Sequence, residues 1–323
     1  MNINEIIKFN SVIVIQSLPS GEKETGKILV EELKKHHSPE TIELKKIKNS
    51  GELNLILSNI KENMLLNPAF TPIINIETHG CEQGIGFADR SFMEWAELMD
   101  QLRELNRLRN NQLIVCLSCC FGITYLRQLQ ISKYSSCGHL IAPKVKISPS
   151  EILSSLLDFF NGILTEELAS LDIALERLPK DKFDFFRSEE FFLNALTWTI
   201  INYENKKNGI KDEVKKQLEM LINSPNSLYF QLNESEREDF LNAQYERVDS
   251  YMIDWEKFIA GMSYIFLGED KEGYANHVVE CARDYISKNS EEWSFISNIF
   301  MQKIMFSLSQ SLLSSGLFNR LRR

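Results

Sequence analysis

Two short apolar runs in this sequence each end on residues that can do covalent chemistry. Residues 73–77 are followed by His79, and residues 113–118 are followed by the cysteine pair 119–120. In a parallel sheet the carboxyl ends of neighbouring strands meet at one edge, so side chains that follow two such strands converge. A cysteine and a histidine brought together there can act as a nucleophile and its proton carrier. The pattern therefore predicts a thiol nucleophile with a histidine general acid and base.

The elements that would hold these residues alternate between strand and helix. Short apolar runs rich in β-branched residues predict buried strands at residues 11–17, 72–79, 113–118 and 138–142. Amphipathic or capped stretches predict helices at residues 22–37, 53–60, 91–105, 124–130, 148–160 and 166–178. Residues 41–47 predict an edge strand, and the glycine-rich residues 81–89 predict a loop or small hairpin. This order is typical of an α/β fold with a mainly parallel sheet flanked by helices.

The pattern changes after about residue 180. No later run predicts a strand, and Ser188 with the two glutamates after it is typical of a helix start. A helical stripe of large apolar residues follows at Val248, Met252, Trp255, Ile259, Met262 and Phe266. Residues 291–313 predict another long helix. We therefore expect two parts, an α/β core over residues 1–178 and a C-terminal all-helical region over residues 179–323.

The same motifs carry a family resemblance. Thr-His-Gly at residues 78–80 follows a buried strand, and roughly 40 residues later comes Leu-Ser-Cys-Cys-Phe-Gly at residues 117–122. This order resembles the caspase-like (clan CD) cysteine peptidases. It is most similar to their CHAT branch, whose strand reads much like V-V-L-S-A-C-x-x-G. Later pieces also fit the CHAT pattern, at residues 138–143, 148–160 and 166–178.

The resemblance implies a role for several residues. On the family motifs, Cys120 takes the position of the nucleophile and His79 that of the general acid and base. An oxyanion hole of backbone amides is implied at Gly80 and Cys120, and a glycine suits this place because a side chain would crowd the substrate carbonyl. Such a peptidase needs no cofactor and no metal. The expected substrate is a protein, cut by a cysteine endopeptidase whose core spans residues 1–178.

The pocket that would select the substrate side chain departs from a related pattern. Metacaspases carry an acid two residues before the nucleophile, which resembles a device for binding Arg or Lys. Here that position is Ser118. Asp89 and Glu82 lie near the cleft in this interpretation and are candidate pocket residues, while Arg90 and Arg127 are candidates for selecting an acidic side chain.

Two further hypotheses stay open beside the peptidase. One is a noncatalytic caspase-like module that binds a partner through the same cleft. The other is a zinc-stabilised binding protein, for which ligands are available at His79, Cys81, Cys116, Cys119, Cys137 and His139. Cys119 is also a rival nucleophile. Side chains alternate along a strand, so Cys119 and Cys120 would face opposite ways unless the strand has already ended, and the family motif favours Cys120.

Composition narrows the class of protein. A net charge of -9 and a pI near 5.3 argue against nonspecific nucleic-acid binding. No run approaches the roughly 18 apolar residues of a membrane span, and residues 1–5 show no signal-peptide pattern. Three of the six cysteines crowd into residues 116–120, which favours reduced thiols and a cytoplasmic protein. CHAT-like peptidases often sit in regulated systems, so the resemblance implies an activating partner that docks on residues 179–323, as in a prokaryotic defence or cell-death pathway.

Overall fold

The computed structural model describes residues 9–165, 171–222, 233–250, 254–268, 277–282 and 284. Its elements are, in chain order, β1 (Ser11–Gln16), α1 (Thr25–His36), η1 (Pro39–Thr41), β2 (Ile42–Lys46), α2 (Ser50–Leu66), β3 (Pro72–Glu77), β4 (His79–Gly80), β5 (Gly84–Gly86), β6 (Phe92–Glu94), α3 (Trp95–Leu108), β7 (Ile114–Ser118), η2 (Gly122–Gln128), β8 (His139–Pro143), α4 (Pro149–Thr165), α5 (Leu171–Glu176), β9 (Phe183–Arg187), α6 (Ser188–Ile222), α7 (Glu234–Ser250) and α8 (Trp255–Leu267). The chain divides into two compact units, Met1–Phe192 with Tyr264–Glu269, and Leu193–Ser263 with Asp270–Arg323.

The first unit is built on a six-stranded sheet in the order β2-β1-β3-β7-β8-β9. Its first five strands run parallel to their neighbours, and β9 pairs with β8 in the antiparallel sense. Helical connections allow consecutive strands to run in the same direction. The predicted α/β class with a mainly parallel sheet flanked by helices is confirmed, and so is the edge position of β2.

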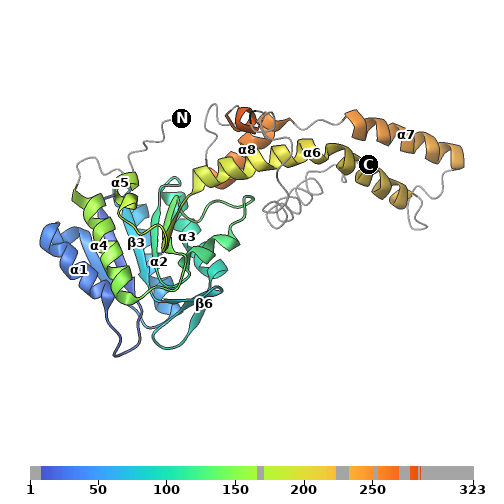
Figure 1. Cartoon of the computed structure of the whole chain (residues 1–323). Helices are drawn as coiled ribbons and strands as arrows, with labels where there is room; N and C mark the ends of the chain where they lie inside the picture. Colours follow the sequence, from blue (N-terminus) through green and yellow to red (C-terminus); the bar gives the residue numbers. More distant parts are fainter. Residues whose placement is uncertain are drawn as a thin grey trace. The chain divides into compact units, whose positions relative to one another are not determined.

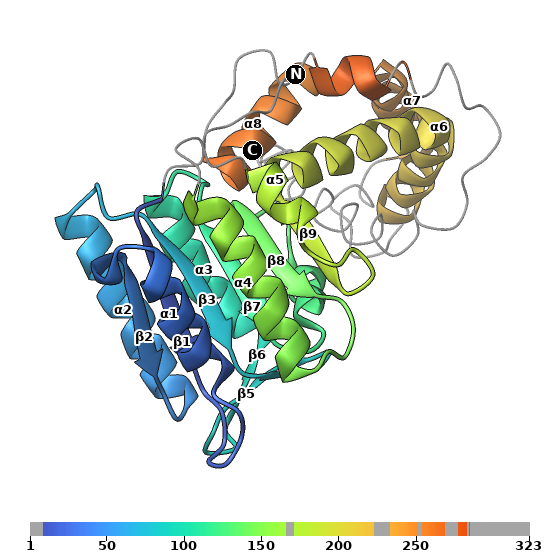
Figure 2. The ribbon, with the colours of Figure 1, turned by 60° about the vertical axis from the view of Figure 1, so that its left-hand side comes forward.

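Helices cover both faces of this sheet. Helices α1 and α4 pack together on one face, and α2 and α3 pack together on the other (Figures 1 and 2). We call these the α1–α4 face and the α2–α3 face. Because both are buried, most side chains of either parity along a strand are apolar, and the strands are therefore nearly continuous apolar runs in the sequence. In β1, for example, Val12 and Val14 face α1, while Ile13 and Ile15 face α2 and α3.

A second, smaller sheet of β4, β5 and β6 follows β3 directly. It contains the predicted hairpin at residues 81–89, but it also corrects one expectation. Phe92 fits the apolar period of the predicted helix, yet it lies in β6, is 48% exposed, and pairs with Gly86. The edge of β5 offers backbone partners to β6, so α3 begins only at Trp95. The Trp95 indole N–H donates to Cys81 O at 3.2 Å and ties this helix start to the small sheet.

The expectation that no strand follows residue 180 is wrong. Strand β9, Phe183–Arg187, closes the large sheet as its antiparallel edge. Its sequence is short and contains both Asp184 and Arg187, so it lacks the β-branched apolar run that marks the other strands. Antiparallel pairing with β8, and not the local sequence pattern, makes this segment a strand. The predicted helix start at Ser188 is confirmed as the first residue of α6.

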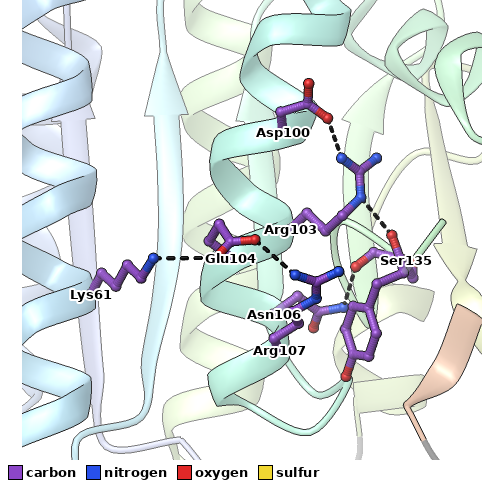
Figure 3. A network of polar contacts seen from close by, with 8 residues as sticks. Lys61, Asp100, Arg103, Glu104, Asn106, Arg107 and Ser135 are labelled. Atoms are coloured by element: carbon purple, nitrogen blue, oxygen red, sulfur yellow. Dashed lines mark hydrogen bonds and ion pairs between the residues drawn. The ribbon is translucent and has the colours of Figure 1, made fainter. Parts of the chain in front are cut away.

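Buried polar side chains on α3 hold the segment that leads into β8. Arg103 Nε donates to Tyr134 O at 2.7 Å, and Asn106 Nδ2 donates to Ser135 O at 2.9 Å. Figure 3 shows these contacts beside three ion pairs: Arg103–Asp100 and Arg107–Glu104 lie within α3, and Lys61–Glu104 joins α2 to α3. A buried polar group needs such partners, because leaving it unpaired is unfavourable. The α3 network therefore fixes the entry to β8.

The end of α8 belongs to the first unit, although the residues before it do not. Phe266 stacks on Phe192 with ring centroids 5.8 Å apart. Its carbonyl oxygen accepts the N–H of Ser135 at 2.8 Å. The segment before β8 is therefore anchored twice, by α3, which precedes it in the sequence, and by the end of α8, which follows it.

The described part of the second unit is helical, in agreement with the helical region expected over residues 179–323. Tyr203 on α6 packs edge-on against Trp255 on α8, with ring centroids 5.3 Å apart. Lys215 on α6 pairs with Asp249 on α7 at 2.7 Å. The predicted helix at 291–313 and the stripe position Met252 lie outside the described residues. The roles expected for residues 1–178 and 179–323 stay predictions. None of the helices that the structure describes is both long and apolar enough to cross a bilayer.

Candidate active site

The neighbouring strands β3 and β7 bring the two predicted motifs to one edge of the sheet. Glu77, the last residue of β3, is in register with Ser118, the last residue of β7. His79 and Cys120 each follow two residues after this pair. The parallel pairing therefore delivers the histidine and the cysteine to the same carboxyl edge, as the sequence pattern predicts.

Gly80 packs directly against the cysteine pair. A Cβ atom at this position would collide with the carbonyl oxygen of Cys120 and lie 2.9 Å from Cys119 Sγ. Only a residue without a side chain can be this close to another backbone segment. The backbone after β3 and the backbone after β7 are thus in contact at the point where the reactive residues stand.

A tight turn begins at Cys119 and contains Cys120. The N–H of Gly122 donates to Cys119 O at 3.3 Å, and Phe121 adopts a left-handed conformation with φ 58°. Cys119 packs into the apolar core of the α2–α3 face, whereas Cys120 is half-buried on the α1–α4 face. Burial raises the pKa of the Cys119 thiol far above its usual range, so it stays protonated. Since the thiolate is the attacking species, Cys120 is the better placed of the two.

Cys120 and His79 each have a polar neighbour of their own. Cys120 Sγ lies 3.6 Å from Ile147 O. The His79 side chain is 58% exposed, and its Nε2 lies 2.9 and 3.1 Å from the two carboxylate oxygens of Glu22. The described part of the chain contains no hydrogen bond between His79 and Cys120. Catalytic hydrogen bonds often form only when substrate is bound, so a dyad does not require this bond in the free protein.

Four buried polar side chains line the α1–α4 face at the carboxyl ends of β1, β3 and β7. We call this set the polar row: Gln16, Asn75, Glu77 and Ser118. Ser118 Oγ donates to Asn75 Oδ1 at 2.5 Å. Gln16 Oε1 accepts the N–H of Lys27, in the first turn of α1, at 2.9 Å. Asn75 Nδ2 and Glu77 Oε2 are buried without a hydrogen-bond partner.

Glu77 is the ionisable member of the polar row. Its carboxyl group lies against Gly26 of α1, where an added Cβ would collide with Glu77 Oε2. Burial raises the pKa of Glu77 from 4.5 to about 7, although a backbone hydrogen bond from Gly26 opposes the shift. The carboxyl group thus gains and loses its proton near neutral pH. Sequence reasoning missed this row, although the alternation of Asn75 and Glu77 with isoleucines is a visible signal.

The predicted pocket residues are placed differently from one another. Ser118 is buried and its hydroxyl is engaged by Asn75, as described above. Glu82 is exposed and pairs with Arg127 at 3.2 Å, while its carbonyl oxygen accepts Thr124 Oγ1 at 3.3 Å, next to the cysteine turn. The backbone N–H of Ser91 donates to Asp89 Oδ1 at 2.7 Å, and hydrogen bonding by Ser91 lowers the pKa of the Asp89 carboxyl group. Ser118 and Glu82 therefore lie beside the cysteine turn, whereas Asp89 serves the loop before β6.

The zinc interpretation is wrong for the cysteine pair on which it depends. Cys116 faces the α1–α4 side of the sheet and Cys119 the α2–α3 side, so the two thiols point away from each other. His139 is buried and stacks on Phe185, and burial lowers the pKa of its ring to about 3. Across the described residues, no three His, Cys, Asp or Glu side chains form a group that could hold a metal ion.

Comparison with known proteins gives a fold likeness alone. No protein-family model matches the sequence, and no curated protein is similar to it. The structure is similar to that of a secreted C11 cysteine protease from Bacteroides thetaiotaomicron in complex with an irreversible peptide inhibitor. The match covers 59% of this chain and 70% of that chain, with 8% identity and a TM-score of 0.36. A likeness this weak says nothing about activity.

Proposed function

We propose that this protein is a cysteine endopeptidase with Cys120 as nucleophile and His79 as general acid and base. One observation carries the proposal, the contact of Gly80 with the turn at Cys119 and Cys120. It brings the segment after β3 against the segment after β7, with a half-buried thiol on one and an exposed imidazole on the other. Nucleophilic catalysis needs these two groups within reach of one substrate bond.

The reaction follows from these two side chains. His79 takes the proton of the Cys120 thiol, and the thiolate attacks the substrate carbonyl carbon. The C–N bond then breaks, His79 gives its proton to the leaving amine, and a thioester remains on Cys120. Water attacks the thioester, His79 takes the proton of the water, and the C–S bond breaks to release the acid and restore the thiol. No cofactor enters any of these steps.

The oxyanion of each tetrahedral intermediate would be held by the backbone amides of Gly80 and Cys120. The close approach of these two residues supports this part of the proposal. Backbone donors fixed in place stabilise developing negative charge without reorganisation. Ser118 and Glu82, beside the cysteine turn, are the nearest of the proposed pocket residues, and Asp89 is the third.

The finer parts of the proposal concern family and setting. The motif at residues 117–122 supports membership of the caspase-like clan, closest to its CHAT branch. The crowding of reduced cysteines at 116–120 supports a cytoplasmic protein. The substrate is a protein, and a regulatory partner docks on the helical region within residues 179–323.

The test compares wild type with Cys120→Ala and Cys119→Ala. Each protein is incubated with a peptide library and a lysate, and new protein termini are mapped by mass spectrometry. The proposal expects cleavage by wild type and Cys119→Ala, and none by Cys120→Ala. Equal cleavage by wild type and Cys120→Ala would exclude Cys120 as nucleophile. No cleavage by any of them, with one protein retained by all three, would instead support a noncatalytic partner-binding module.

A further inference from the structure

The exposed imidazole of His79 is paired with a carboxylate from a distant part of the chain. Glu22 lies in the loop between β1 and α1, 57 residues before His79 in the sequence. Both of its carboxylate oxygens lie within 3.1 Å of His79 Nε2. Most other ion pairs on α1 and α3 join residues three or four apart on one helix. The Glu22–His79 pair instead links the segments that follow two neighbouring strands, β1 and β3.

The loop that carries Glu22 is fixed by its own backbone. The N–H of Glu22 donates to Pro19 O at 3.2 Å and closes a turn that contains Gly21 at φ 91°. Glycine adopts this left-handed conformation without strain. Beyond the turn, α1 is anchored to the polar row, since the N–H of Lys27 donates to Gln16 Oε1. Glu22 is therefore held between a closed turn and an anchored helix.

The pairing with Glu22 determines which ring nitrogen of His79 can accept a proton. A carboxylate can only accept, so the Nε2 atom beside Glu22 carries the proton. In the neutral ring, Nδ1 then holds the lone pair. We propose that Glu22 is a positioning residue that completes a Glu22–His79–Cys120 set, an inference that rests on the proposed peptidase function. Glu22 fixes the ring and its tautomer, and Nδ1 takes the proton from Cys120 and gives it to the leaving amine.

The charge of Glu22 also acts during the reaction. When Nδ1 takes the Cys120 proton, the ring becomes an imidazolium that still donates from Nε2 to Glu22. A neighbouring carboxylate stabilises that cation, as in other sets that combine an acid, a histidine and a nucleophile. The pair is about half exposed, so water screens it and its effect is smaller than that of a buried carboxylate.

The test measures the reactivity of Cys120 without any need for substrate. Wild type, Glu22→Gln, Glu22→Asp and His79→Ala are treated with iodoacetamide at neutral pH, and the alkylation of each cysteine is followed by mass spectrometry. The exposed Cys281 gives the internal reference rate. Glu24→Gln is the matched control, because Glu24 lies in the same loop but pairs with Lys46.

We expect Glu22→Gln to slow alkylation of Cys120 by about tenfold relative to Cys281, with partial recovery in Glu22→Asp and no change in Glu24→Gln. In the wild-type protein, 15N NMR of the His79 ring should show the proton on Nε2. A wild-type ring with its proton on Nδ1 would overturn the inference even if a variant does not fold. So would a Glu22→Gln protein that reacts like wild type while His79→Ala reacts more slowly.

The outcomes separate this inference from the peptidase itself. Cleavage that depends on Cys120 and His79 but not on Glu22 would leave the peptidase in place and overturn the role of Glu22. Reactivity of Cys120 that depends on Glu22, in a protein that cleaves nothing, would support the Glu22–His79–Cys120 coupling and count against the peptidase.

Discussion

The two faces of the central sheet end differently at its carboxyl edge. On the α2–α3 face the last inward residues are apolar or inert: Ile15, Ile76, Leu117 and Cys119. On the α1–α4 face the corresponding residues are polar or accessible: Gln16, Glu77, Ser118 and Cys120. Burying polar groups without full partners is unfavourable, and Glu77 Oε2 and Asn75 Nδ2 have none. Apolar packing alone therefore explains the residues on the α2–α3 face, whereas the α1–α4 face carries polar residues that packing does not favour.

The largest effect should separate the two cysteines that stand on these two faces. Replacement of Cys120 by alanine removes the nucleophile, and we expect cleavage to fall by at least about a thousandfold. Cys119→Ala should keep its rate within about threefold, because a protonated core thiol takes no part in the reaction. Rates measured on the first cleaved peptide found in the library check this. If Cys119→Ala lost as much cleavage activity as Cys120→Ala, the two faces would not differ in the way described.

The next effect concerns two glycines on neighbouring strands of the small sheet, Gly80 on β4 and Gly86 on β5. Gly80→Ala must push the cysteine turn away, and we expect a loss of about 2 kcal/mol in the free energy of unfolding, together with loss of cleavage. Gly86 pairs with His79, but a Cβ there would meet only His79 Cβ at 4.0 Å. Gly86→Ala should change stability by less than about 0.5 kcal/mol. Urea unfolding of both variants tests this, and equal losses would contradict the close approach at Gly80.

Glu77 makes the α1–α4 face sensitive to pH. Its pKa is raised from 4.5 to about 7 in the folded protein, so the folded chain holds this proton to higher pH than the unfolded chain. The free energy of unfolding should therefore fall as pH rises from about 4.5 to about 7, by roughly 1–3 kcal/mol. Glu77→Gln removes this titration. We expect it to be more stable than wild type at pH 8 and to lose that advantage at pH 5, as measured by thermal unfolding at both values.

The reverse order of stabilities would show that the Glu77 carboxylate is held in its charged form. Glu151 is a suitable comparison, because it is only partly buried and Lys182 and Ser148 lower its pKa to about 2. Glu151→Gln should show no gain at pH 8. A gain there as large as that of Glu77→Gln would mean that burial is not the cause.

The smallest effect concerns one hydrogen bond within the polar row. Ser118→Ala removes the donor to Asn75 Oδ1 inside the protein, and we expect a loss of about 1 kcal/mol in the free energy of unfolding. Ser154→Ala removes an exposed hydroxyl that donates to Glu151 O, and its change should be close to zero. Chemical denaturation of the two variants compares them. Equal values would mean that the buried bond adds nothing beyond a surface one.

The sequence predicts those parts of the fold that depend on local pattern. Apolar runs with β-branched residues mark β1, β3, β7 and β8, because both sheet faces are buried and most strand residues on either face are apolar. Strand β9 and the start of α3 escape this reasoning. Their partners β8 and β5 decide their structure, and tertiary pairing overrides a local pattern that fits a helix equally well.

The candidate site divides in the same way. His79 and Cys120 are predictable because each follows a recognisable strand and parallel strands end at one edge. Glu22 is not, because a glutamate in a loop has no periodic pattern and its partner is 57 residues away. The opposite orientation of Cys119 and Cys120 is expected from alternation, but their unequal burial depends on the turn at Phe121.

The return of the chain at Phe266 has a consequence for synthesis on the ribosome. The first unit is complete only when this residue packs on Phe192, yet the segment between them belongs to the other unit. At about 5–20 residues per second, roughly 4–15 seconds pass between the translation of the two phenylalanines. During that interval Phe191 and Phe192 lack the contact with Phe266 that covers part of their apolar surface. A chaperone bound near the exit tunnel would meet this surface before the protein could close it.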